Sequence, residues 1–178
     1  MASVERDDRG IWGKALVAIP AVVLGGLAFG WLSNSGMDNS WYRGLQMPGI
    51  QPPSYLFGPV WVALYALMGL ALAVVWHEPP SKDRTIAVRL FFIQLALNYA
   101  WSPVFFLGHM IEIALVLLIL ILLVALVTAK SFRSIRSMAG WLLLPYLLWL
   151  CLAVVLNYET AGLNPGADAA PLGLTGAK

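Results

Sequence analysis

Long apolar runs dominate this sequence and limit what it can fold into. The chain has 178 residues, of which 60% are hydrophobic and 11% are charged, whereas soluble proteins average about 45–50% apolar and about 25% charged residues. A helix needs about 20 apolar residues to cross the hydrocarbon core of a bilayer. Five segments reach this length, at roughly residues 12–32, 55–76, 86–106, 110–129 and 138–158. The sequence therefore predicts an all-α membrane protein, with a bundle of five transmembrane helices in a single domain over residues 1–163.

The basic residues predict how these helices are oriented. Five crossings place the N-terminus and the segments 77–85 and 130–137 on one side of the membrane, and nine of the 11 Lys and Arg residues lie there. Only Arg43 and Lys178 lie on the other side. Because basic residues gather on the cytoplasmic side, the N-terminus is expected in the cytoplasm of a bacterial inner-membrane protein, and the C-terminus outside. The small, Pro- and Gly-rich tail from residue 164 to 178 is expected to be disordered.

The first loop, residues 33–54, is unusually long for a membrane protein of this size. Pro48, Pro52 and Pro53 prevent a regular helix before about residue 54, since proline lacks an N–H donor and restricts the residue before it. The loop is therefore expected to be a rigid, irregular segment that leads directly into the second apolar run.

Three aromatic residues follow the loop at a spacing of four. Phe57, Trp61 and Tyr65 consequently share one face of the helix. A rigid loop above such a face suits the lid and wall of a pocket for a flat apolar ligand. An aromatic belt at the membrane interface, followed by ordinary helix packing, would give the same pattern.

Two further helix faces combine an amide, a tryptophan and no charge. They consist of Gln94, Asn98, Trp101 and Phe105 in one helix, and of Pro145, Trp149, Ala153 and Asn157 in another. In one interpretation, Asn98 and Asn157 form hydrogen bonds between helices. In the other, the two faces join the aromatic face of the second helix around an apolar cavity with a few amide groups, which suits a planar lipophilic ligand.

Several kinds of chemistry lack the residues that they need. No Asp, Glu, Lys or Arg lies near the middle of an apolar run, and there is no glycine-rich phosphate loop. The single Cys151 cannot form a disulfide within the chain, and His77 and His109 are expected on opposite membrane faces, too far apart to share a metal. Either histidine alone is more typical of a membrane interface than of an axial haem ligand. The sequence predicts no metal site, no obligatory cofactor and no nucleic-acid partner.

Four motifs resemble those of the TspO/MBR family, the tryptophan-rich sensory and translocator proteins. The matching stretches are W-Y-x-G-L-Q-x-P (41–48), P-P-x-x-x-F-G-P-V-W-x-x-L-Y (52–65), Q-L-A-L-N-x-A-W-x-P-x-F-F (94–106) and P-Y-L-x-W-x-x-x-A-x-x-L-N-Y (145–158). The resemblance implies a five-helix bundle, commonly a homodimer. It also implies a pocket under the first loop for porphyrins, haem-like tetrapyrroles, sterol-like molecules or synthetic aromatic ligands.

The resemblance and the helix faces together predict a ligand site. Its expected wall is Phe57, Trp61, Tyr65, Asn98, Trp101, Trp149, Ala153, Leu156 and Asn157, and its expected lid includes Trp41, Tyr42, Pro52 and Pro53. Leu156 is included because of the resemblance alone.

The sequence differs from the family pattern at two places that bear on the choice of ligand. Gly49 and Ile50 stand where many relatives have tryptophan between the loop prolines, which weakens the case for porphyrin stacking or photochemistry in the lid. Tyr158 is not followed by a basic residue within five positions, so a proposed sterol motif is broken.

The expected function is that of a membrane binding protein, translocator or sensor for porphyrin-like planar ligands, which regulates tetrapyrrole metabolism or a stress response. The alternative is an enzyme that degrades bound porphyrin in light by means of pocket tryptophans. A third possibility is a structural or partner-regulating membrane protein whose pocket is vestigial.

Overall fold

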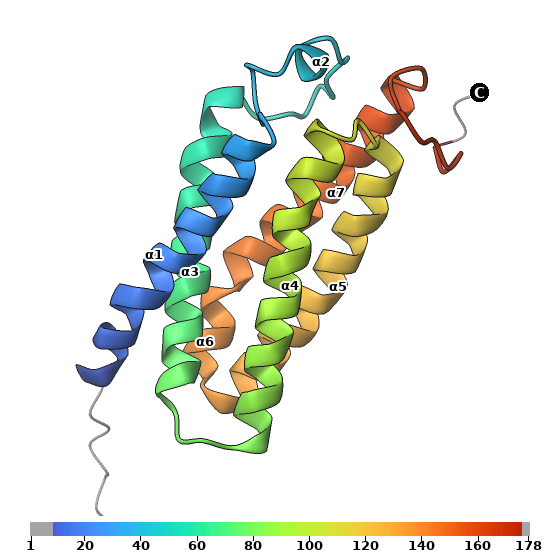
Figure 1. The fold of residues 1–178 in the computed structure, drawn as a ribbon. Coiled ribbons are helices and arrows are strands. Elements are labelled where there is room, and N and C mark those ends of the chain that lie inside the picture. Colours follow the sequence, from blue (N-terminus) through green and yellow to red (C-terminus); the bar gives the residue numbers. More distant parts are fainter. Residues whose placement is uncertain (1–8, 176–178) are drawn as a thin grey trace, which may run out of the picture.

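The chain folds into a bundle of long helices (Figure 1). A computed structural model describes residues 9–175, and those residues contain no strand. The elements are α1 (Arg9–Leu32), α2 (Ser40–Arg43), the 3₁₀ helix η1 (Ser54–Leu56), α3 (Phe57–His77), α4 (Lys82–Phe106), α5 (Ile111–Ile135), α6 (Ser137–Leu142) and α7 (Leu144–Leu163). The first loop and the C-terminal segment lie at one end of the bundle, here called the lid end. The α3–α4 connection and the α5–α6 junction lie at the other, called the far end.

Within residues 9–175, four helical stretches are long and apolar enough to cross a membrane. They are Arg9–Leu32, Ser54–His77, Ile111–Ile135 and Ser137–Leu163. Helix α4 has the length, at 25 residues, but charged residues occupy its first turns and amides interrupt its later ones. An all-helical fold with several apolar spans is thus confirmed, while a fifth crossing by α4 stays a prediction.

The helices extend beyond the apolar runs that predict them. Helix α5 continues to Ile135 rather than ending near residue 129, and α4 begins at Lys82 rather than near residue 86. Hydropathy marks the part of a helix that suits lipid, whereas basic residues such as Lys130 continue the same helix into water. The last predicted helix is in fact two, α6 and α7, and Pro145 lies in the first turn of α7, where a missing N–H is tolerated.

The far half of the bundle is closely packed. Ala73, Val74 and Val75 of α3 are 0% exposed. Phe91 of α4 stacks on Phe132 of α5, with ring centroids 5.7 Å apart. Small residues of α3 let its neighbours approach closely in this half of the bundle.

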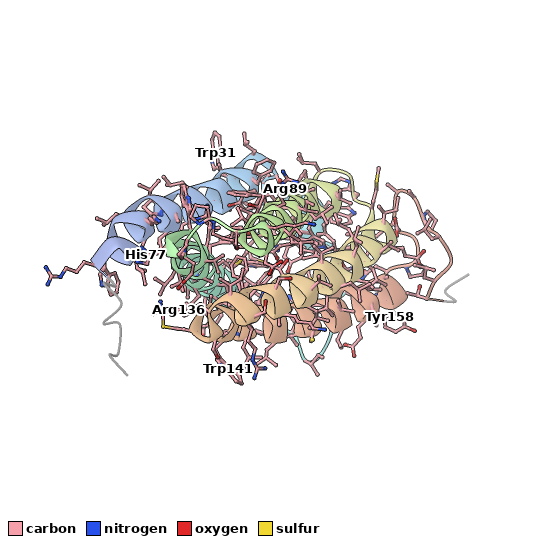
Figure 2. All side chains as sticks on the ribbon, turned by 90° about the horizontal axis from the view of Figure 1, so that it is seen from below. Trp31, His77, Arg89, Arg136, Trp141 and Tyr158 are labelled. Atoms are coloured by element: carbon pink, nitrogen blue, oxygen red, sulfur yellow. The ribbon has the colours of Figure 1, made fainter. Side chains whose placement is uncertain are left out.

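Apolar side chains also cover the outside of the bundle. Trp31 is 81% exposed and Trp141 is 56% exposed. Figure 2, a view from the far end, shows both at the periphery. The Arg133 guanidinium carbon lies 5.1 Å from the centre of the Trp141 ring, a distance that favours a cation–π contact. An apolar exterior of this kind is suited to lipid rather than to water.

The first loop is fixed to the bundle by a buried asparagine and a tryptophan. The Asn39 side chain caps α2 by accepting a hydrogen bond from the Tyr42 N–H, and its Nδ2 donates to the Phe106 carbonyl at 3.1 Å. The Trp41 ring stacks on His109, with centroids 4.3 Å apart. These contacts tie the loop to the end of α4 and to the turn that follows it.

The residues after α7 also make specific contacts. The sequence predicts disorder over residues 164–178. Residues 164–175, here called the strap, form turns in the structure, and residues 176–178 lie outside the described residues. Asn164 accepts a hydrogen bond from the Gln46 N–H at 2.8 Å and donates to the Gln46 carbonyl at 2.9 Å. The strap is thereby joined to the first loop.

The strap continues across the beginning of α5. The Asp168 carboxylate accepts a hydrogen bond from the N–H of Glu112, in the first turn of α5, and the Ala169 N–H donates to the His109 carbonyl. The Glu112 carboxylate accepts hydrogen bonds from the backbone of Leu172 and Thr175. Polar anchors of this kind can order a segment that is rich in small residues, proline and glycine, which is why composition alone predicts disorder there.

Candidate ligand-binding site

A cavity of about 490 Å³ lies in the lid half of the bundle. Ligand pockets for small molecules typically measure about 300–1,000 Å³. Its wall contains residues of α1, α3, α4, α5 and α7 and of the first loop. All nine residues predicted for the wall line it: Phe57, Trp61, Tyr65, Asn98, Trp101, Trp149, Ala153, Leu156 and Asn157. The structure thus brings these side chains together, and their role in binding a ligand stays a prediction.

Aromatic rings of α3 and α7 form one side of the cavity. Trp149 meets Phe57 edge-to-face at 5.7 Å and Trp61 edge-to-face at 6.4 Å. The Trp61 ring also lies 5.2 Å from that of Tyr65. Such pairs contribute about 0.5–1.5 kcal/mol each beyond the area that they bury. The aromatic row of α3 therefore has a partner on α7 and does not form only an interfacial belt.

The first loop closes onto α4 through Tyr42. Its ring packs against Phe105 at 6.2 Å and Phe106 at 5.2 Å, and Phe105 in turn stacks on Trp101 at 5.0 Å. Burial raises the pKa of Tyr42, and the hydrogen bond that its hydroxyl accepts from Gln51 only partly offsets this. The phenol is therefore neutral at physiological pH and adds no charge to the cavity.

A hydrogen-bonded chain of three side chains crosses the bundle beside the cavity. The Tyr65 hydroxyl donates to Asn98 Oδ1 at 2.8 Å, and Asn98 Nδ2 donates to the Tyr146 hydroxyl at 3.0 Å. Asn98 consequently links α3, α4 and α7 while also lining the cavity. Its position is compatible both with hydrogen bonding between helices and with a place in the cavity wall. Sequence reasoning missed Tyr146. A tyrosine within an apolar helix requires a partner for its hydroxyl, and that signal would have found it.

Glycines of α1 make room for two of the tyrosines. A Cβ atom on Gly26 would lie 2.1 Å from the Tyr65 ring, and one on Gly25 would lie 2.7 Å from the Tyr99 hydroxyl. The Tyr99 hydroxyl donates to the Val22 carbonyl. Sequence reasoning missed the contribution of these two glycines to the site, because glycine has no side chain whose chemistry would indicate a site.

Three of the four predicted lid residues do not reach the cavity wall. Tyr42 lines the cavity, whereas Trp41, Pro52 and Pro53 do not. Trp41 instead stacks on His109 and donates from Nε1 to the Ala167 carbonyl of the strap. Its role is to hold the lid, because its ring faces the strap side of the loop.

Gly49 and Ile50, the two loop positions at which the resemblance implies tryptophan, are also absent from the cavity wall. Ile50 is 56% exposed, and a Cβ atom on Gly49 would meet no heavy atom within 4 Å. The missing loop tryptophans therefore leave the wall of the cavity unchanged.

No group of three or more His, Cys, Asp or Glu side chains within residues 9–175 is placed to hold a metal ion. The groups around the cavity are aromatic rings, aliphatic side chains, amides and hydroxyls, together with one carboxylate, Asp38, in the exposed part of the loop. Such a lining favours binding of a flat apolar molecule over acid–base chemistry.

Comparison with known proteins covers the same part of the chain. The model of the TspO/MBR family matches residues 17–162, a range that includes every residue of the cavity wall. The Tryptophan-rich protein TspO of Archaeoglobus fulgidus is 35% identical over 85% of this chain and 97% of its own length. The human Translocator protein is 40% identical over 66% of this chain and 71% of its own. Protein CrtK of Rhodobacter capsulatus is 32% identical over 71% and 80%.

Proposed function

The chain belongs to the TspO/MBR family of membrane proteins, and on that premise we propose that it binds porphyrin-like planar ligands as a membrane sensor or translocator. The observation that carries the proposal is the cavity of about 490 Å³ under the first loop, whose wall includes Phe57, Trp61, Trp101 and Trp149. Flat aromatic rings at edge-to-face angles suit a flat aromatic ligand. The regulation of tetrapyrrole metabolism or of a stress response would follow from ligand occupancy.

Titration with protoporphyrin tests this function. Bound porphyrin should quench the fluorescence of the cavity tryptophans with saturation at one ligand per chain. Trp141→Phe is the matched control, because this exposed ring lies away from the cavity, and it should keep the quenching signal. Trp61→Phe should reduce that signal. Quenching that never saturates, and that both variants share equally, would show partition into detergent instead of binding.

A fifth crossing by α4 and a cytoplasmic N-terminus are part of the proposal. They place the first loop and the C-terminus on the non-cytoplasmic side, and in the structure the first loop and the strap lie at the same end of the bundle (Figure 1). Single cysteines at Ser40 and Ala177, in a Cys151→Ser background, should react with an impermeant maleimide in intact cells or spheroplasts. Labelling only after membrane disruption would refute the orientation. The homodimer implied by the resemblance stays a prediction.

A second candidate function is light-dependent degradation of bound porphyrin. The observation in its favour is that four tryptophans, Trp31, Trp61, Trp101 and Trp149, line one cavity. The test is the decay of the porphyrin Soret band in the presence of the protein, in light and in darkness. We expect little protein-dependent decay. Stoichiometric loss of the band in light would favour the enzyme over the binding protein.

A further inference from the structure

Two buried polar atoms on the cavity wall have no hydrogen-bond partner within residues 9–175. They are Nε1 of Trp101 and Oδ1 of Asn157. Nearly all buried polar groups in proteins are paired, and leaving one unpaired costs about 1–3 kcal/mol. Both residues line the cavity, so a molecule bound there would lie beside both side chains.

The structure determines whether each unpaired atom is a hydrogen-bond donor or an acceptor. An indole nitrogen can only donate a hydrogen bond, so Trp101 presents a donor. The Asn157 amide could in principle be turned either way, but its Nδ2 donates to the Ile111 carbonyl at 2.9 Å. Turning the amide would bring two oxygens together, so Asn157 presents an acceptor.

These two atoms belong to the same part of the cavity. Trp101 packs against the small apolar cluster that includes Phe105, Phe106 and Ile111, and Asn157 is hydrogen-bonded to the Ile111 backbone. Both therefore adjoin the beginning of α5, at the lid end of the bundle.

The other buried amide of the cavity wall, that of Asn98, already has hydrogen-bond partners. Asn98 bonds to the hydroxyls of Tyr65 and Tyr146. Thr160, one turn beyond Asn157, donates to the Leu156 carbonyl. Polar residues of the first loop that line the cavity, such as Asn34, Asp38 and Ser54, are exposed and can bond to water. The unmet hydrogen-bonding capacity of the buried wall is therefore one donor on α4 and one acceptor on α7.

We propose that Trp101 and Asn157 form a polar subsite that selects planar ligands carrying both a hydrogen-bond acceptor and a donor at one edge. An amide, a lactam or an undissociated carboxylic acid carries both groups, whereas an ester or a tertiary amide carries only the acceptor and a hydrocarbon carries neither. The inference rests on the proposed function, because it assumes that the cavity holds a planar ligand.

Three tricyclic compounds of one shape test the subsite. Phenanthridinone has a carbonyl and an N–H, its N-methyl derivative keeps only the carbonyl, and phenanthrene has neither. Each would compete with bound protoporphyrin on the purified full-length protein. Each compound also partitions into detergent, but to the same extent whichever protein variant is present. For each compound, the ratio of its Kd for the variant to its Kd for the wild type therefore does not depend on this partition.

Each variant should act on a particular group of the ligand. Trp101→Phe removes the N–H and keeps an aromatic ring, so it should weaken phenanthridinone and its N-methyl derivative about 2- to 12-fold more than phenanthrene. Asn157→Leu should weaken phenanthridinone by a similar extra factor relative to the other two. Thr128→Val is the matched control. Thr128 is a buried, hydrogen-bonded residue that does not line the cavity, so this variant should leave the three ratios equal.

The outcomes separate the subsite from the proposed function. If each variant changes the affinity of all three compounds by one factor, its role is structural and the subsite is refuted. If Asn157→Leu fails to fold, Trp101→Phe still decides, since equal losses for the carbonyl compounds and phenanthrene would refute the donor half. If protoporphyrin itself does not bind saturably to the wild-type protein, the proposed function fails, and the subsite fails with it.

Discussion

The far half and the lid half of the bundle are built from the same helices but pack in opposite ways. In the far half, α3 contributes Ala71, Ala73 and Val75, all 0% exposed, and its neighbours close around them. In the lid half, α3 contributes Phe57, Trp61 and Tyr65, whose rings border a cavity. On α3, small residues let the neighbouring helices meet in the far half, whereas large flat residues border the cavity in the lid half. Stability should therefore depend on the far half, and ligand binding on the lid half.

The largest effect is expected from Phe132→Ala in the far half. Phe132 is 0% exposed and stacks on Phe91, so its truncation should lower the free energy of unfolding by about 3–5 kcal/mol. Thermal unfolding in detergent measures this as a lower Tm. Leu123→Ala, at a position that is 55% exposed on the same helix, is the control and should change the Tm far less. Equal shifts for the two variants would contradict the division into halves.

Ala153→Leu tests the lid half. Ala153 lines the cavity one turn from both Trp149 and Asn157, and added volume in a packed site costs about 1–3 kcal/mol. Porphyrin affinity should consequently fall about 5- to 150-fold, with the Tm nearly unchanged. Ala96→Leu makes the same substitution at an exposed position of α4 and should keep the affinity of the wild type. If Ala153→Leu binds porphyrin normally, this side of the cavity is not in contact with the ligand.

Asn164→Ala tests how the lid is held. The variant removes both hydrogen bonds between Asn164 and Gln46, so the Gln46 amide should exchange with deuterium about tenfold faster, which corresponds to about 1.4 kcal/mol. Hydrogen-exchange mass spectrometry of the segment 44–47 measures this. Ser35→Ala removes a loop hydrogen bond that does not involve the strap and should leave that exchange unchanged. Unaltered protection in Asn164→Ala would mean that the strap does not restrain the lid.

The smallest effect, and one of opposite sign, is expected at Gln94. Its amide is 0% exposed and neither polar atom has a partner within residues 9–175. Gln94→Met keeps a flexible side chain of similar length and should raise the free energy of unfolding by about 1 kcal/mol, since it removes an unpaired buried group. Gln94→Glu, a substitution of the same size that adds a carboxyl group, should lower it. A loss of stability in Gln94→Met would show that the amide is paired in the folded protein.

Helix periodicity predicts the aromatic and amide faces because a straight helix fixes which residues share a side. Phe57, Trp61 and Tyr65 line one cavity for that reason, as do Trp149, Ala153 and Asn157 on the facing helix. Periodicity does not say which partners a face will meet. It therefore identifies Asn98 and Tyr65, but neither the hydrogen bond between them nor Tyr146, the second partner of the Asn98 amide.

Other parts of the site depend on distant contacts that no local pattern encodes. Gly26 belongs to the site because Tyr65 occupies the space of its missing side chain. Trp41 is recognisable as a loop aromatic, but its partners His109 and Ala167 lie far along the chain. The order of the strap follows from Asn164 and Asp168 meeting backbone groups that only the folded bundle brings near.

The position of the strap bears on how the protein should be prepared. Thr175, whose N–H and hydroxyl donate to the Glu112 carboxylate, is the last residue of the strap. A purification tag or fluorescent protein fused there would pull on a segment that is bonded to both the first loop and α5. Fusion to the N-terminus avoids this, because the described chain begins at the opposite end of the bundle. Ligand-binding measurements on a C-terminal fusion would report on a lid with altered restraints.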